Sequence, residues 1–267
     1  MMDKIVYQSL HDNNIKEYGD PIIEISHLYK SFGDNNVLID FNLTIKKGEN
    51  VVVLGKSGCG KSVLIKCIVG LLNYDSGSIK VFGEEISQLK QSDLDKIRAR
   101  IGFLFQSSAL YDSMTVRENL EFPLRRHGKH KSKLEVKELI EETLNQVGLL
   151  NAIDVMPSEL SGGMRKRIGL ARSLVLKPEI ILYDEPTTGL DPITAREISN
   201  LMLQMQKSYN TTSIIISHDM HCARLTANRL IMMIDGINYA QGTFEELKSI
   251  KEPKVHAFFE NEDLDKL

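Results

Sequence analysis

The chain lacks the features that mark several large classes of protein. Its 33 basic residues are slightly outnumbered by 36 acidic ones, which gives a net charge of −3 and argues against a nucleic-acid partner, because such domains are strongly basic. No apolar run reaches the roughly 18 residues that a membrane-spanning helix needs. The three cysteines, Cys59, Cys67 and Cys222, are odd in number and have no metal-ligand spacing. They predict reduced thiols and a cytoplasmic location.

Both ends of the chain differ in composition from the region between them. Residues 1–21 are polar and lack the apolar core of a secretory signal, so we expect a flexible leader. Residues 22–250 are predicted to form a single domain without internal repeats. In the tail, residues 251–267, Phe258 and Phe259 either belong to a short helix that packs on a neighbour or lie in a frayed end, which is the default expectation for a terminus.

Residues 55–62 match the phosphate-loop pattern G-x-x-x-x-G-K-S. The eight residues are Gly55, Lys56, Ser57, Gly58, Cys59, Gly60, Lys61 and Ser62. Apolar residues 50–54 precede the loop and the largely apolar 63–72 follow it, as the strand–loop–helix context requires. Glycines let the backbone turn so that N–H groups and the helix N-terminus face phosphates. We expect Lys61 at the β- and γ-phosphates of ATP and Ser62 on Mg²⁺; the alternative, a glycine-rich turn that binds nothing, is disfavoured by this context.

A second motif supplies two carboxylates. The apolar residues 180–183 are typical of a buried strand and lead into Asp184 and Glu185 at the edge of the sheet. Asp184 suits the Mg²⁺ shell, and Glu185 suits a general base that polarises an attacking water. Pro186 biases Glu185 away from helical torsions. The alternative, in which the pair only caps a strand, loses weight beside a phosphate loop.

A third motif, Ser161-Gly162-Gly163 after Leu160, precedes a helix expected over residues 164–176. Ser161 is a candidate N-cap, and an exposed helix N-terminus with two glycines is another anion site. Two phosphate sites for one nucleotide suggest that this one serves a second subunit.

The remaining patterns indicate an α/β architecture. Parallel strands are expected at residues 51–54, 101–105, 180–183 and 213–217, joined by crossover helices, and antiparallel strands within 22–45 and at 78–82. Helical spacing of apolar residues over 134–147 places a helical insertion between Gln106 and Ser161. Asp191 and Pro192 are expected to begin a helix that extends to residue 205.

Together these motifs resemble the ATP-binding-cassette (ABC) ATPases over residues 22–250. The resemblance implies a P-loop NTPase fold with a RecA-like parallel core, an antiparallel β subdomain and a helical subdomain at about 107–163. It also implies a head-to-tail dimer that buries two ATP molecules, each between the phosphate loop of one copy and Ser161, Gly162 and Gly163 of the other.

The resemblance also implies roles for residues outside the three motifs. Phe32 would stack on adenine in preference to Tyr29, and Asp191 would cross the dimer. Gln106 would join catalysis to the transporter and serve as a Mg²⁺ ligand, and His218 would contact the γ-phosphate.

Departures from the family pattern are few. Val63 stands where a Thr usually adds an α-phosphate contact, and we expect modestly weaker nucleotide binding. Met164 and Arg165 stand where many members have Gln, so a polar side chain near the partner's ribose is lost. Cys59 is at a variable loop position, where a redox switch is an alternative. Hydrolysis is still expected.

Within this family, residues 105–116, 156–167 and 191–194 resemble the ATPase subunits of Mla/MCE-type transporters, which move phospholipids between bacterial inner and outer membranes. That resemblance implies a multispanning permease, a periplasmic MCE-domain protein and a peripheral position on the cytoplasmic face of the inner membrane. Other ABC importers or exporters, and a non-transport ATPase such as an iron–sulfur assembly factor, are the alternatives.

Overall fold

The computed structural model describes residues 18–127 and 131–260, and two sheets organise these residues. The larger sheet has, in spatial order, β10 (Ile237–Gly242), β9 (Arg229–Ile234), β3 (Asn50–Leu54), β8 (Thr212–Ser217), β7 (Ile180–Asp184) and β6 (Ile101–Leu104). Its strands are parallel except for β10, which pairs with β9 in the antiparallel sense. The predicted α/β fold with a parallel core is confirmed.

The central strands follow from their composition. Every residue of β3, β7 and β8 is buried, as expected for parallel strands covered on both faces. Two strands of the larger sheet escaped the sequence analysis: β9 and β10, which form a hairpin. Their turn is Asp235-Gly236, with φ of 51° and 76°, a strong two-residue hairpin signal that the sequence does contain.

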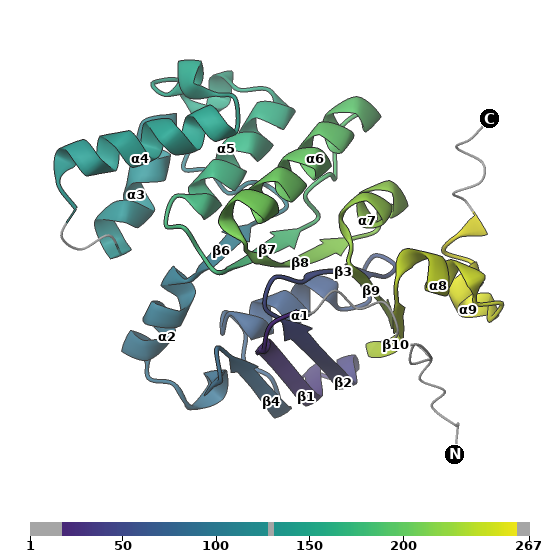
Figure 1. The fold of residues 1–267 in the computed structure, drawn as a ribbon. Helices are drawn as coiled ribbons and strands as arrows, with labels where there is room; N and C mark the ends of the chain where they lie inside the picture. The colour runs from purple at the N-terminus through teal and green to yellow at the C-terminus, as the bar shows by residue number, and fades with distance from the viewer. Residues whose placement is uncertain (1–17, 128–130, 261–267) are drawn as a thin grey trace.

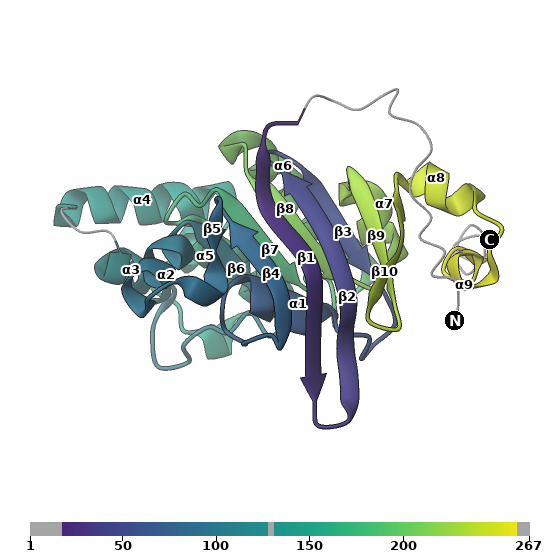
Figure 2. The same ribbon diagram turned by 90° about the horizontal axis from the view of Figure 1, so that it is seen from below.

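The smaller sheet is antiparallel and has the order β2 (Asn35–Lys46), β1 (Pro21–Phe32), β4 (Ser76–Val81) and β5 (Glu84–Glu85). The long strands β1 and β2 lie side by side in Figure 2. Helix α1 (Lys61–Ile68) packs between the sheets, in a cluster that joins Leu64 and Ile68 to residues of both. This packing fixes the end of β3 from which the phosphate loop emerges.

The remaining helices, with short 3₁₀ turns at Ile86–Gln88, Leu150–Ala152 and Pro157–Glu159, are α2 (Gln91–Ala99), α3 (Val116–His127), α4 (Lys133–Gln146), α5 (Gly162–Leu174), α6 (Pro192–Tyr209), α7 (Met220–Thr226), α8 (Phe244–Ser249) and α9 (Pro253–His256). Figures 1 and 2 place α3, α4 and α5 at one end of the molecule and α8 and α9 at the other. None of the helices in the described part of the chain is long and apolar enough to cross a membrane.

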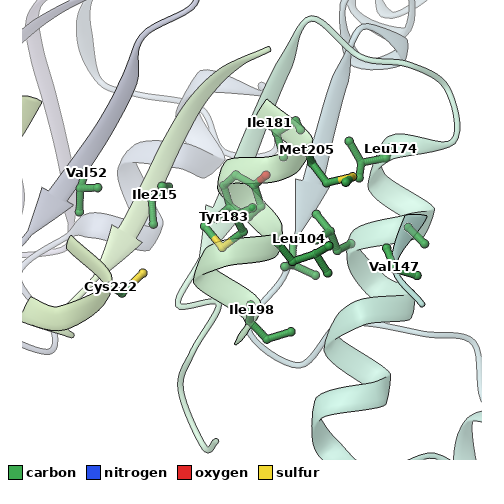
Figure 3. Close-up of a cluster of buried hydrophobic side chains, with 14 of the residues drawn as sticks. Val52, Leu104, Val147, Leu174, Ile181, Tyr183, Ile198, Met205, Ile215 and Cys222 are labelled. Atoms are coloured by element: carbon green, nitrogen blue, oxygen red, sulfur yellow. The ribbon is translucent and has the colours of Figure 1, made fainter. Parts of the chain in front are cut away.

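A continuous apolar core joins the helical end to the large sheet. Leu104 and Tyr183 of the sheet, Leu174 of α5 and Ile198 of α6 belong to one buried cluster (Figure 3). The same cluster contains Leu144 of α4, so α5 is packed on one side against the other helices and on the other against β6, which pairs with the strand that ends at Asp184. A shift of α5 would therefore be felt at the sheet edge.

The tail corrects one default expectation. Phe259 is buried, and its ring centroid lies 5.4 Å from that of Phe244 in α8, so a frayed end is wrong for this residue. The short helix α9 precedes it. Residues 261–267, and residues 1–17 of the expected leader, lie outside the described residues.

Candidate nucleotide site

A cleft of about 670 Å³ opens where the phosphate loop meets the carboxyl ends of the large sheet. Most of the lining residues come from the motifs read in the sequence: Phe32, Ser57, Gly58, Gly60, Lys61, Ser62, Val63, Gln106, Glu185 and His218, with Val37 and Thr188 added by the fold. The elements involved are far apart in the chain, and the sheet edge brings them together because parallel strands end on one side.

The phosphate loop has the backbone that its sequence predicts. Gly58 and Gly60 have φ of 80° and 107°, in the left-handed region that favours glycine. A Cβ at Gly60 would lie 2.8 Å from the Val37 carbonyl oxygen, so a side chain is excluded there on both grounds. The loop ends at the first turn of α1, where backbone N–H groups have no acceptor within the helix. This turn is suited to an anion.

The Lys61 side chain lies over the phosphate loop and lines the cleft. The Lys61 ammonium is 5% exposed and donates to the carbonyl oxygens of Gly55 and Lys56, at 2.7 and 3.1 Å. These contacts hold the ammonium over the loop, where we expect the phosphates. Its Nζ is also 3.7 Å from Glu185 Oε1.

The donor set for Mg²⁺ fits the ion that the sequence predicts. Ser62 Oγ donates to Asp184 Oδ1 at 2.9 Å, so two oxygen ligands from elements 122 residues apart are adjacent. Burial raises the pKa of the Asp184 carboxyl above its ordinary value, with the neighbouring Glu185 charge adding to the effect. A buried carboxylate of this kind gains from a bound cation. We expect Ser62 and Asp184 to hold Mg²⁺, with Gln106 at the cleft wall.

Glu185 is held firmly on one side. Its Oε2 accepts hydrogen bonds from Thr188 Oγ1 at 3.1 Å and, in the tautomer with the proton on Nδ1, from His218 at 2.8 Å. Its Oε1 faces Lys61. Residue Glu185 has φ of 50°, so Pro186 excludes helical torsions as expected but the backbone is left-handed rather than extended. Such a conformation costs about 1–3 kcal/mol and persists where surrounding contacts hold it.

The third motif lies elsewhere on the chain. Ser161 caps α5 by accepting from the Met164 N–H at 3.2 Å, as expected, but Ser161, Gly162 and Gly163 do not line the cleft. A Cβ at Gly163 would approach Thr194 Cγ2 to 2.7 Å, so the motif packs directly against the start of α6.

Asp191 borders the same surface. It caps α6 by accepting from the N–H groups of Ile193 and Thr194, at 3.1 and 3.0 Å, and hydrogen bonds at Thr194 lower the pKa of its carboxyl. The third motif and Asp191 thus form one exposed face, separate from the cleft of their own chain.

Three residues at the site were missed by sequence reasoning. Val37 lines the cleft, Thr188 orients Glu185, and Lys166 of α5 donates to the Gln106 and Glu185 carbonyl oxygens. The sequence does contain a sign of this last role. Lys166 lies one helical turn after the third motif, on the face of α5 whose other buried side chains are apolar. Cys59, a residue of the phosphate loop, is half-buried. Burial raises the pKa of its thiol, which disfavours the reactive thiolate that a redox switch needs.

Phe32 lies at the cleft mouth and is 49% exposed, whereas Tyr29 is not part of the lining. We expect Phe32→Ala to weaken ATP binding by about 1–3 kcal/mol, or about 5- to 150-fold, because base–aromatic stacking is lost. A fluorescent ATP analogue titrated against the full chain measures this. The matched control is Tyr29→Ala; equal losses in both variants would contradict the assignment of Phe32.

Comparison with known proteins gives consistent matches. A family model described as ABC transporter matches residues 38–188. The "Probable ribonucleotide transport ATP-binding protein mkl" of Mycobacterium tuberculosis is 42% identical over 88% of this chain, which spans 66% of that relative's length. The "Intermembrane phospholipid transport system ATP-binding protein MlaF" of Haemophilus influenzae is 37% identical over 90% of this chain and 91% of its own.

An importer subunit and a solved structure are also similar. The "Methionine import ATP-binding protein MetN" of Clostridium tetani is 37% identical over 91% of this chain and 76% of its own. The ATP-binding cassette MJ0796, solved as a dimer in a post-hydrolysis state with ADP and phosphate, has a TM-score of 0.76 and 31% identity, and the match covers 83% of this chain and 98% of that one.

Proposed function

The chain belongs to the ABC transporter family and is an ATP-hydrolysing subunit, and from that premise we propose that it powers phospholipid transport between two membranes. The observation that carries the ATPase part of the proposal is the cleft, and the similarity to the phospholipid-transport relative carries the substrate assignment. In the cleft, Lys61 and Ser62 of the phosphate loop meet the buried Asp184 and Glu185 at the end of β7.

The geometry supports a division of labour within the cleft. Lys61 and the first turn of α1 bind the phosphates, while bound Mg²⁺, held by Ser62 and Asp184, would neutralise developing negative charge. Glu185 Oε2 already accepts two hydrogen bonds, which leaves Oε1 to take the proton of the attacking water. The hydroxyl then bonds to the γ-phosphorus as the bond to the β-phosphate oxygen breaks, giving ADP and phosphate.

We propose that the working unit is a dimer. The phosphate loop faces the cleft, but the face formed by Ser161, Gly162, Gly163 and Asp191 does not. That face offers an exposed helix N-terminus to an anion, so a second copy in head-to-tail orientation would complete each ATP site. The dimeric state of the similar cassette MJ0796 supports this arrangement.

A permease is the second proposed partner. An apolar groove is lined by Val69, Leu71, Ile101, Phe103 and Phe105, together with Arg98. Leu71 in this groove is 55% exposed. Phe105 directly precedes Gln106, so a segment seated in this groove would contact the loop that reaches the cleft. This is where we place the multispanning permease, with the chain peripheral on the cytoplasmic face of the inner membrane.

The phospholipid assignment has support from two directions. The resemblance to Mla/MCE-type ATPases came from the sequence alone, and the phospholipid-transport relative is similar over nearly the whole length of both chains. On this proposal an MCE-domain protein in the periplasm completes the system.

Affinity purification tests the proposal. The Glu185→Gln chain, purified from native membranes with ATP and analysed by mass spectrometry, should recover a multispanning permease together with an MCE-domain protein. Recovery of a permease with a solute-binding protein instead would favour the second candidate, an amino-acid importer, for which the MetN similarity is the specific support. Recovery of only soluble partners would overturn the transport assignment.

A further inference from the structure

A buried cation on α5 contacts the main chain of two segments proposed to act in catalysis. Lys166 is 5% exposed, and its Nζ lies 2.5 Å from the carbonyl oxygen of Gln106 and 3.2 Å from that of Glu185. An ammonium has three N–H donors, and two of them are committed here. One side chain therefore joins the helix that starts at the third motif, the loop at the cleft wall and the residue proposed as the base.

These partners are unusual for a buried lysine. A buried cation is costly unless it is paired, and burial lowers the pKa of Lys166, while the charges of Asp184 and Glu185 act in the opposite direction. Nζ nonetheless donates to carbonyl oxygens and not to either carboxylate. The contact thus restrains the backbone without engaging either carboxylate.

The Glu185 backbone needs such a restraint. Its left-handed φ of 50° is strained for a non-glycine residue and persists only where neighbours hold it. Its N–H donates to the Ile216 carbonyl at 2.9 Å, and its carbonyl accepts from the Thr188 N–H at 3.3 Å and from Lys166 Nζ at 3.2 Å. The first contact comes from the sheet and the second from the turn that follows Glu185, so Lys166 supplies the contact from α5.

Helix α5 holds the neighbouring loop in the same way. Arg172 donates to the carbonyl oxygens of Ser108 and Ala109, at 3.0 and 2.8 Å, and these two residues also have left-handed φ, 61° and 47°. The loop after Gln106 is therefore fastened to α5 at two points, Lys166 and Arg172. A displacement of α5 would move the loop and the Glu185 carbonyl together.

We propose that Lys166 is a positioning residue that holds the main chains of Glu185 and Gln106 in a fixed relation, so that Glu185 reaches the attacking water only when α5 is in place. The proposal rests on the proposed role of Glu185 as general base. The third motif lies one turn away on the same helix. A movement of that motif would therefore shift Lys166 and, through it, the main chain of Glu185 in the same chain.

The test compares variants of Lys166 in the full chain by steady-state ATP hydrolysis and ATP binding. We expect Lys166→Met to lower kcat by about 10²-fold, as a small misplacement of a catalytic group does, with ATP affinity unchanged. Lys166→Arg, which keeps the charge and the N–H donors, should recover most of the turnover. Lys207→Met, at an exposed position of α6, controls for the loss of one positive charge.

A double-mutant cycle with Glu185→Gln separates the two proposals. If Lys166 acts by positioning Glu185, then Lys166→Met should cause no further loss once the base is absent. Multiplying losses in the double variant, a parallel loss of ATP binding, or normal turnover in Lys166→Met would each overturn the role of Lys166. Normal turnover in Glu185→Gln alone would instead overturn the base assignment. Lys166→Gln, a neutral N–H donor, replaces the methionine variant if thermal unfolding shows that the latter does not fold.

Discussion

Glu185→Gln is expected to bind ATP normally, hold two copies together and lose turnover by about 10²- to 10⁴-fold, the usual contribution of a positioned general base. A glutamine has the size of Glu185 and its amide oxygen still accepts from Thr188 and His218. It cannot take a proton from water. ATP therefore stays intact in the closed dimer, which phosphate release and size-exclusion chromatography with ATP would measure.

The matched control for this variant is Glu179→Gln. Glu179 precedes the same strand, β7, at its opposite end, where it pairs with Arg100 at 2.7 Å and its side chain is 40% exposed. An exposed ion pair contributes little, so both folding and turnover should be retained. If Glu185→Gln hydrolysed ATP at the wild-type rate with its permease present, another group would have to be the base.

Lys61→Ala is expected to weaken ATP binding itself. The ammonium is buried at the phosphate loop, and its charge-assisted hydrogen bonds to phosphate oxygens should each contribute about 1.5–3 kcal/mol, so one such contact is worth about 10- to 150-fold in Kd. Turnover should fall with binding, in contrast to Glu185→Gln. Isothermal titration with ATP and Mg²⁺ distinguishes the two patterns directly.

Lys80→Ala provides the comparison at a lysine away from the cleft. Lys80 is exposed on β4 and does not line the cleft, so ATP affinity should be retained. Unchanged affinity in Lys61→Ala would remove this residue from the phosphate site and leave the backbone of the loop as the main source of binding.

Much of the site could be read from short stretches of sequence because each stretch carries its own geometry. Gly58 and Gly60 allow the turn, an apolar strand leads into Asp184 and Glu185, and Ser161 caps its helix. These features depend on neighbours a few residues away. The β9–β10 hairpin carries a similar local signal, the Asp235-Gly236 turn, so it too is predictable from neighbouring residues, although the sequence analysis did not identify it.

The sequence by itself determined that this chain has a phosphate-loop motif, an acidic strand end and a separate helix N-terminus capped by Ser161, since the backbone torsions and helix ends that create them are local. Only the tertiary structure decided how Glu185 is held: Thr188 and His218 on its carboxylate, Lys166 on its carbonyl, and a left-handed φ. Those contacts join β7, β8 and α5, and no local pattern specifies which atoms meet when separate elements pack around a shared core.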